Sequence, residues 1–192
     1  MRWEALHARA AIVGVHGAGK STLLEHFVPC IAEVVFRRDS QGQLVQQEAQ
    51  RVDKPSLQAV WLQLRKSAPL SMVIPWQDLH PGRLLIIDGY EQLVYWRRAA
   101  LIARTKLRGV KLLLTSHRRT ILPTLCELSV SAATARQIVS QLTLGRGDIQ
   151  TLSDEELQER LRTHDGNMRE VLMSFYDQVE ENRRRSNAAS AR

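Results

Sequence analysis

A glycine-rich segment near the N-terminus has the residue types and spacing needed to bind a polyphosphate. Residues 14–22 read Gly-Val-His-Gly-Ala-Gly-Lys-Ser-Thr, which fits the pattern of glycine, four residues, and Gly-Lys-Ser/Thr. Glycines let the backbone approach closely, so that its N–H groups can donate to phosphate oxygens. Lys20 would reach the β- and γ-phosphates, and the Ser21 hydroxyl would coordinate Mg²⁺. The other candidates for phosphate contact are Gly14, His16, Gly17, Ala18, Gly19 and Thr22.

The flanking residues favour a strand before this segment and a helix after it. Ala10–Val13 is an uninterrupted apolar run, and Thr22–Val28 has the composition of a helix. The first turn of a helix offers N–H groups without acceptors and the positive end of the helix dipole, which together attract an anion. A structural turn that fits the pattern by chance is the alternative, and the strand–loop–helix context disfavours it.

A second apolar run ends in an acid. Leu84–Ile87 holds four consecutive apolar residues before Asp88, which is typical of a strand buried on both faces of a parallel sheet. Its carboxyl end is expected beside the phosphate loop, so Asp88 could hold the metal directly or through water. Glu91 could orient or deprotonate a water that attacks the γ-phosphate. The alternatives are a helix cap for Asp88 and an exposed first-turn acid for Glu91.

Polar residues also follow the apolar strand predicted over residues 110–115. Thr115, Ser116 and His117 stand at its end, where one of them could contact the γ-phosphate or the attacking water. Which one does so stays open, because alternate residues of a strand face opposite sides of the sheet. His117 could transfer a proton, or it could simply be a solvated loop histidine.

The rest of the chain predicts alternating strands and helices. Strands are expected over residues 10–15, 31–37, 84–88, 110–115 and 125–131. Helices are expected over residues 20–28 (ended by Pro29), from 55 to about 64, 92–108 and 132–142. The helix from residue 55 depends on the helical spacing of Leu57, Val60, Trp61 and Leu64. Residues 40–53 are expected to form a surface excursion, and the segment 145–148 a loop.

The predicted helix over residues 92–108 concentrates positive charge. Its apolar side would carry Leu93, Trp96, Ala100 and Leu101, and its cations would lie on the other sides. A solvated helix face is one interpretation, and a polyanion site is the other. The cations are Arg97, Arg98, Arg104, Lys106 and Arg108.

Two further helices are expected near the C-terminus. Ser153–Glu156 and Asn167–Glu170 both fit the capping-box pattern. The last helix should bury the apolar residues Val171, Leu172, Phe175, Tyr176 and Val179. Arg169 stands in its first turn, where the helix dipole disfavours a cation, so a nucleotide phosphate or a nearby carboxylate could hold it.

Composition sets the broad class of protein. The chain has 192 residues, a formal net charge of +7, 44% apolar and 24% charged residues, all ordinary for a globular protein. It contains no apolar run of about 18 residues, so no transmembrane helix is expected, and residues 1–7 lack the apolar core expected of a signal peptide. Cys30 and Cys126 are expected to be reduced, packed thiols of a cytoplasmic protein. The tail over residues 186–192 is expected to be disordered.

Taken together, these motifs resemble a P-loop NTPase of the AAA+ and STAND type. Residues 14–22 correspond to Walker A and 84–88 to Walker B, and Asp88-Gly89-Tyr90-Glu91 is similar to the variant found in NACHT-like proteins. The segment 115–117 falls where such proteins carry sensor 1, and Arg169 falls where the lid carries the sensor 2 arginine. The resemblance implies a three-layer αβα sandwich with a five-stranded parallel sheet of order 5-1-4-3-2, a helical lid and Mg²⁺-dependent hydrolysis of ATP.

Gly89 departs from the usual family pattern, which has a catalytic glutamate directly after the aspartate. Glu91 would have to replace it, and hydrolysis is expected to be slow. No guanine-specificity motif is visible, which favours ATP over GTP, and no transporter signature is present. No arginine finger can be assigned.

The sequence therefore predicts a nucleotide-binding core over residues 1–131 and a helical lid over 132–185. Lys20, Asp88 and Glu91 are the predicted catalytic residues, Ser21 and Asp88 the Mg²⁺ ligands, and Arg169 the lid contact to ATP. Two alternatives remain. One is a small-molecule kinase that uses the same loop, and the other is a nucleotide-binding module that docks nucleic acid or protein. A partner protein or a homo-oligomer is compatible with all three.

Overall fold

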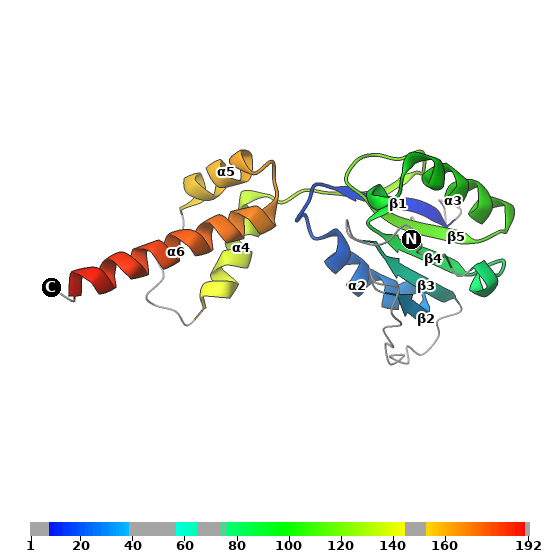
Figure 1. Cartoon of the computed structure of the whole chain (residues 1–192), viewed down its shortest axis with the longest axis horizontal. Coiled ribbons are helices and arrows are strands. Elements are labelled where there is room, and N and C mark those ends of the chain that lie inside the picture. Colours follow the sequence, from blue (N-terminus) through cyan, green and yellow to red (C-terminus); the bar gives the residue numbers. More distant parts are fainter. Residues whose placement is uncertain (1–7, 39–56, 65–73, 75, 145–152, 191–192) are drawn as a thin grey trace. The chain divides into compact units, whose positions relative to one another are not determined.

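A computed structural model describes residues 8–38, 57–64, 74, 76–144 and 153–190 of the chain. Within these residues the fold is α/β, with one sheet of six strands in the order β2-β3-β4-β5-β1-β6 (Figure 1). The strands are β1 (Arg9–Gly14), β2 (Glu33–Arg38), β3 (Gln58–Gln63), β4 (Leu84–Asp88), β5 (Lys111–Ser116) and β6 (Thr124–Leu128). The helices are α2 (Lys20–Ile31), α3 (Tyr95–Leu107), α4 (Ala132–Thr143), α5 (Asp154–Thr163) and α6 (Met168–Ser190), with 3₁₀ turns η1 (Trp76–Asp78) and η2 (Tyr90–Gln92).

The predicted fold class is confirmed, and the five predicted strands occur in the predicted order. The predicted helix from residue 55 to about 64 is wrong, because Gln58–Gln63 forms β3, inserted between β2 and β4. Four consecutive residues of β3, from Ala59 to Leu62, are buried, as expected for a strand covered on both faces. Over so short a segment, the same apolar spacing fits a helix and a buried strand equally well.

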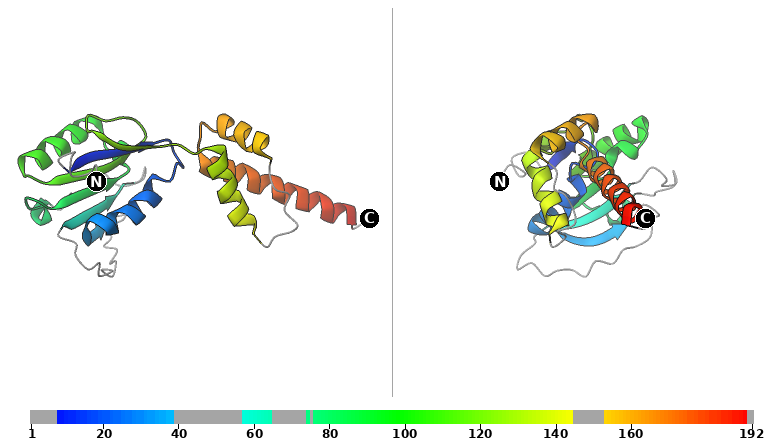
Figure 2. Two further views of the ribbon diagram at one scale, coloured as in Figure 1. Left: turned by 180° about the vertical axis from the view of Figure 1, so that it is seen from behind. Right: turned by 90° about the vertical axis from the view of Figure 1, so that its left-hand side faces the viewer.

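The sheet positions its helices on opposite faces. β2 pairs with β3, β3 with β4, β4 with β5, and β5 with β1, all in parallel. The crossover through α2 runs from β1 outward to β2, whereas the crossover through α3 runs from β4 back to β5. Because both crossovers are expected to be right-handed, the two helices should cover opposite faces. The views in Figure 2 show this arrangement, which makes three layers.

The functional candidates gather where the parallel strands end. Val13 of β1 pairs in register with Ser116 of β5, and Ile87 of β4 pairs with Leu114. β5 therefore lies between the strand that leads into the glycine-rich loop and the strand that ends in Asp88. Ligands of open α/β sheets bind at this carboxyl edge.

The strands that carry the candidate residues are buried in the core of the sheet. All five residues of β4 are buried, and so are Leu112, Leu113 and Leu114 of β5. Burying a leucine side chain contributes roughly 1.5–3 kcal/mol. The strands that carry the candidate residues are therefore held firmly in the core of the sheet.

Several predicted boundaries shift by a few residues. Pro29 does not end the first helix, because α2 continues to Ile31. The predicted helix over residues 92–108 is preceded by η2 and begins at Tyr95. Trp96 is 65% exposed, so its placement on the apolar side of that helix is wrong, and Ala100 is exposed as well. The buried residues of α3 are Leu101 and Thr105.

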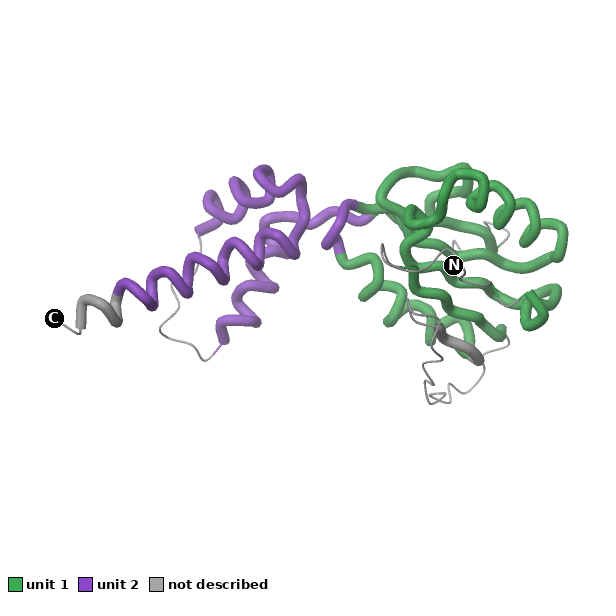
Figure 3. The backbone as a smooth tube through the Cα atoms, in the orientation of Figure 1, with its two compact units in different colours: residues 1–14, 19–127 green, residues 15–18, 128–192 purple. Residues whose placement is uncertain are grey.

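The chain divides into two compact units (Figure 3). Unit 1 comprises residues 1–14 and 19–127, and unit 2 comprises residues 15–18 and 128–192. The predicted boundary lay after residue 131, and the grouping of residues 15–18 with the helical unit was not predicted.

Unit 2 is a three-helix cluster with its own core. The capping box of α5 is confirmed, since Ser153 accepts from the Glu156 N–H and Glu156 accepts from the Ser153 N–H. Tyr176, predicted to be buried, is 59% exposed, and Leu142 of α4 is 60% exposed. The core is formed by Ala135, Val139, Leu157, Leu161, Met168, Val171 and Phe175.

Other predictions concern the ends and the loops. Helix α6 reaches Ser190, so the disordered tail predicted over 186–192 is wrong for residues 186–190, and 191–192 lie outside the described residues. The predicted excursion over 40–53 and the loop over 145–148 also lie outside them. None of the helices in the described ranges is long and apolar enough to cross a membrane. Both cysteines are free, but Cys30 is exposed rather than packed.

Candidate functional site

The glycine-rich segment forms a bend between a strand and a helix, as predicted. β1 ends at Gly14 and α2 begins at Lys20, so the five residues between them form the loop. Gly17 and Gly19 have φ angles of 69° and 85°, in the left-handed region that disfavours side chains. The glycines at these two positions therefore allow the backbone to turn sharply into the helix.

The start of α2 is built without a cap of its own. Gly19 occupies the N-cap position and supplies no side-chain hydrogen bond, and the first turn contains no acid. Ser21 and Thr22, which follow Lys20, are both exposed. An uncapped helix start with no local negative charge is the arrangement that attracts an anion through backbone N–H groups and the helix dipole.

Lys20 lies close to the predicted acidic residues. Its side chain is only 8% exposed, and its Nζ donates to the Gly14 carbonyl at 2.7 Å. Burial lowers the pKa of Lys20 from its ordinary value, while the charge of Glu91 and then that of Asp88 raise it. Both carboxylates therefore act on the Lys20 ammonium, and the structure brings together the three residues predicted to be catalytic.

Asp88 is held by the neighbouring strand. The Thr115 hydroxyl donates to Asp88 Oδ1 at 2.7 Å and accepts from the Gly89 N–H at 2.8 Å. Thr115 and Asp88 are 1% and 5% exposed. A hydroxyl has one proton, and here that proton is directed at the carboxylate because Gly89 N–H supplies the other bond. Among the polar residues at the carboxyl end of β5, Thr115 is thus the residue that orients Asp88.

Gly89 turns the chain from β4 into η2. Its φ is +89°, and a Cβ at this position would lie only 2.6 Å from the Leu64 carbonyl oxygen. That carbonyl belongs to the residue whose N–H donates to the Asp88 carbonyl at 2.7 Å. Only glycine fits so close to the neighbouring chain, which gives a steric reason for a glycine directly after Asp88.

Arg98 braces the turn that carries Glu91. Its Nη2 donates to the Glu91 carbonyl and its Nε to the Leu93 carbonyl, both at 2.7 Å. Its guanidinium also lies 5.5 Å from the ring centroid of buried Tyr90. From the sequence, Arg98 was predicted only as one cation of a helix face. No local sequence pattern indicates that it positions the turn at Glu91.

Glu91 has one bonded and one unbonded carboxylate oxygen. Oε1 lies 2.8 Å from His117 Nε2, and both side chains are 21% exposed. Oε2 is buried and has no hydrogen-bond partner among the described residues. A buried carboxylate oxygen without a donor is costly, and it is the kind of atom that a bound water or substrate group completes.

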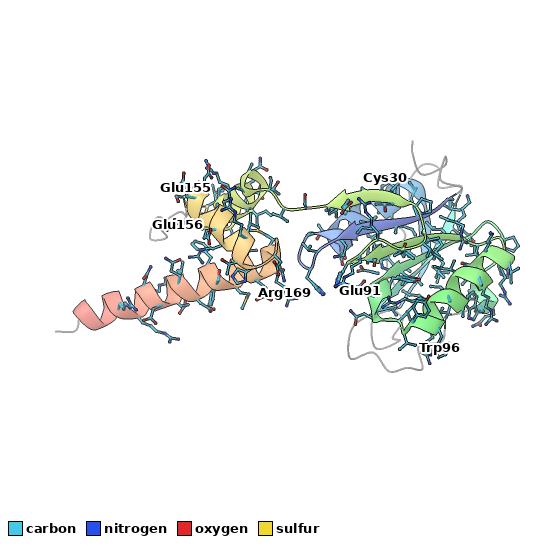
Figure 4. All side chains as sticks on the ribbon, turned by 90° about the horizontal axis from the view of Figure 1, so that it is seen from above. Cys30, Glu91, Trp96, Glu155, Glu156 and Arg169 are labelled. Carbon is cyan, nitrogen blue, oxygen red and sulfur yellow. The ribbon has the colours of Figure 1, made fainter. Side chains whose placement is uncertain are left out.

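In unit 2 the tip of the loop packs on the start of α6. A Cβ at Gly17 would collide with the Asn167 side chain and would lie 2.9 Å from the Arg169 backbone nitrogen. Asn167 caps the helix, because its Oδ1 accepts from the Arg169 N–H at 3.2 Å, whereas its own N–H donates to His164. The Arg169 side chain is exposed (Figure 4). The structure thus brings the Arg169 backbone to the loop tip, and the sequence had identified Asn167 only as a cap.

The remaining predicted residues have simpler surroundings. His16 is exposed, Ala18 is half-buried, and the Ala18 N–H donates to the Val15 carbonyl in the turn. Ser116 is buried and accepts from the Arg118 N–H at 3.4 Å. Among the described residues no cluster of three or more His, Cys, Asp and Glu side chains could hold a metal by itself. Mg²⁺ commonly takes one or two protein ligands together with phosphates and water, so an exposed Ser21 and an oriented Asp88 fit it.

No protein-family model matches the chain, and no curated protein sequence matches it. Any functional conclusion therefore depends on the residues and their geometry.

Proposed function

We propose that the protein binds ATP with Mg²⁺ at the loop between β1 and α2 and hydrolyses it slowly, or uses it as a switch. One observation carries most of this proposal. Lys20 is buried against the loop with the carboxylates of Glu91 and Asp88 close enough to affect its pKa. A cation, an uncapped helix start and two acids at one sheet edge are the parts that phosphoryl chemistry needs.

The loop and Lys20 would bind the nucleotide. Backbone N–H groups around Ala18 and the first turn of α2 would donate to phosphate oxygens. The Lys20 ammonium, now bonded to the Gly14 carbonyl, would move onto the β- and γ-phosphates. This exchange costs little, because a phosphate oxygen is a better acceptor for an ammonium than a neutral carbonyl is.

Ser21 and Asp88 would hold the Mg²⁺, which supplies charge neutralisation on the phosphates when bound. The Thr115 hydroxyl fixes one Asp88 oxygen at 2.7 Å, so the carboxylate is already oriented before a ligand arrives. Such preorganisation lowers the ordering cost of binding.

Glu91 would orient the attacking water. Its Oε2 is the buried oxygen without a hydrogen-bond donor, and its Oε1 is held by His117. A water that donates to Oε2 would satisfy that oxygen and be held for in-line attack. Glu91 lies in η2, which begins directly after the left-handed turn at Gly89.

Phosphate release from ATP with and without Mg²⁺, measured beside equilibrium binding of ATP, tests the proposal. Mg²⁺-dependent binding with release of phosphate supports an ATPase, and binding without release supports a switch. Transfer of phosphate to an added metabolite instead of water would favour a kinase. If ATP binds neither with nor without Mg²⁺, the proposal is wrong.

The two free cysteines support placing the protein in the cytoplasm, where thiols stay reduced.

A further inference from the structure

One continuous segment of unit 1 carries a large excess of positive charge. Between Glu91 and Glu127 the chain contains no aspartate or glutamate. This segment includes α3 and β5, and its positive charge exceeds the net charge of +7 of the whole chain. Its cations are Arg97, Arg98, Arg104, Lys106, Arg108, Lys111, Arg118 and Arg119.

Part of this segment lines an open cavity of about 690 Å³. The cavity lies between the N-terminal half of α3 and residues 117–121, which follow β5. Arg98, Arg118 and Arg119 contribute positive charge to its lining, and Tyr95 and Ile121 contribute apolar surface. Tyr95 and Ile121 are 84% and 82% exposed, so the apolar part of the lining faces solvent.

Exposed aromatic rings and cations lie together at the start of α3. Trp96 is 65% exposed (Figure 4), and the Arg97 guanidinium lies 5.0 Å from its ring centroid. Trp76 is different, because Arg104 and Arg108 both stack against its ring, at 4.2 Å and 5.6 Å. Among the described residues of unit 1, the most exposed aromatic side chains are therefore Tyr95, which lines the cavity, and its neighbour Trp96.

We propose that this surface, formed by Tyr95, Trp96 and the cationic cavity beside them, binds single-stranded nucleic acid. Flat aromatic rings stack with unpaired bases, and the arginines neutralise the phosphates between them. A double helix hides its base faces and would leave the aromatic rings unused. The acids that face this surface are Glu91 in the cavity lining and Glu127, which pairs with Arg119. The eight cations of the segment between them leave an excess of positive charge, which favours a polyanion over an ordinary protein partner.

The cavity also reaches the pair proposed to position water. Glu91 and His117 both line it, and His117 is the residue that holds Glu91 Oε1 at 2.8 Å. A strand bound in the cavity would contact residues 117–121 and so act on His117, which changes how Glu91 is held. We therefore expect bound nucleic acid to alter the rate of ATP hydrolysis. This step depends on the proposed function, whereas binding of the strand does not.

Fluorescence anisotropy with labelled oligo(U) and oligo(dT) of about 12 nucleotides tests the binding, since such a length suits one stacking surface. We expect the full chain to bind these strands, and we expect the affinity to fall steeply between 50 and 200 mM salt, because binding to phosphates releases counterions. Tyr95→Ala and Trp96→Ala should each weaken it by roughly tenfold through lost stacking. Arg118→Ala should weaken binding and reduce its salt dependence.

Matched controls are available on α5 and α6. Tyr176 is 59% exposed, and Arg162 is an exposed cation, so Tyr176→Ala and Arg162→Ala should leave binding unchanged. No binding of either strand at 50 mM salt would overturn the proposal, and so would equal binding of a duplex of the same length. The alternative is that this surface is a contact between copies of the protein, and a measurement of particle size tests it. If Tyr95→Ala or Trp96→Ala dissociates an oligomer and leaves nucleic-acid binding unchanged, the surface is a protein contact and the proposal is wrong. Strand binding that leaves phosphate release unchanged would refute only the coupling through His117.

Discussion

His117 Nε2 lies 2.8 Å from Glu91 Oε1, while the other carboxylate oxygen of Glu91 is buried without a hydrogen-bond donor among the described residues. The histidine therefore holds one oxygen of the carboxylate, and the second oxygen is left buried without a donor. This arrangement gives a physical reason for assigning Glu91, rather than an acid directly after Asp88, to the attacking water.

Glu91→Gln should slow phosphate release by roughly 10²–10⁴-fold, because an amide keeps the shape but is a poor base. Binding of ATP should change little, since no role in phosphate contact is proposed for Glu91. The measurement is single-turnover phosphate release beside equilibrium binding. Glu127→Gln, at an exposed acid paired with Arg119, is the control. Equal turnover in the wild type and the Glu91→Gln variant would remove Glu91 from the mechanism.

Thr115→Val should raise the Mg²⁺ concentration needed for half-maximal ATP binding. The substitution removes the hydrogen bond to Asp88 and leaves the Gly89 N–H without its acceptor, which costs about 1–3 kcal/mol of stability.

Thr105→Val is the control that separates a loss of stability from a change in the Mg²⁺ requirement. Thr105 is buried, donates to the Leu101 carbonyl and accepts from Arg9, so its loss should reduce the free energy of unfolding by a similar amount. It should leave the Mg²⁺ requirement unchanged. A Thr115→Val variant with the wild-type Mg²⁺ requirement would show that Thr115 is only structural.

Gly89→Ala should destabilise the protein more than Gly82→Ala does. Both glycines have φ near +90°, at 89° and 86°, so the left-handed strain of about 1–2 kcal/mol applies to both. Only at Gly89 would the added Cβ meet a backbone atom, the Leu64 carbonyl oxygen at 2.6 Å, whereas nothing lies within 4 Å at Gly82. Urea unfolding of the two variants measures the difference. Equal losses would mean that the contact with Leu64 does not constrain the turn.

Arg169→Ala should reduce the preference for ATP over ADP by roughly tenfold, as expected for one lost charge-assisted hydrogen bond. The reason is that Arg169 lies at the α6 start that packs on the loop tip at Gly17. Competition binding with the two nucleotides provides the measurement, with Arg162→Ala as the control. An unchanged preference would leave Arg169 as an exposed first-turn cation with no part in nucleotide recognition.

The sequence predicted those parts of the fold that depend on local patterns. The glycines at 17 and 19 and the uninterrupted apolar run before Asp88 identify the loop and the central strand, because backbone conformation and two-sided burial leave direct marks on residue type. β3 was mistaken for a helix because its short apolar run fits both periods, and only its pairing with β2 and β4 distinguishes them.

Contacts between distant segments could not be predicted in this way. The donation from Thr115 to Asp88 spans 27 positions, and the sequence offered three equivalent candidates at the end of β5. The packing of Asn167 against Gly17 and the brace that Arg98 provides for Glu91 likewise depend on where the chain returns in space. Trp96 was predicted to be buried because its spacing from Leu93 and Ala100 fits one face of a helix. The helix α3 begins only at Tyr95, and Trp96 is exposed.

Equilibrium binding of ATP with Mg²⁺ to the Lys20→Ala variant, measured by calorimetry, tests the central claim most directly. Lys106→Ala, which removes an exposed lysine of α3, controls for the change in net charge, and circular dichroism confirms that each variant is folded. We expect Lys106→Ala to bind like the wild type and Lys20→Ala to lose affinity by about 30-fold or more, since a buried charged partner of the phosphates is removed. A folded Lys20→Ala variant that binds ATP with wild-type affinity would contradict the account.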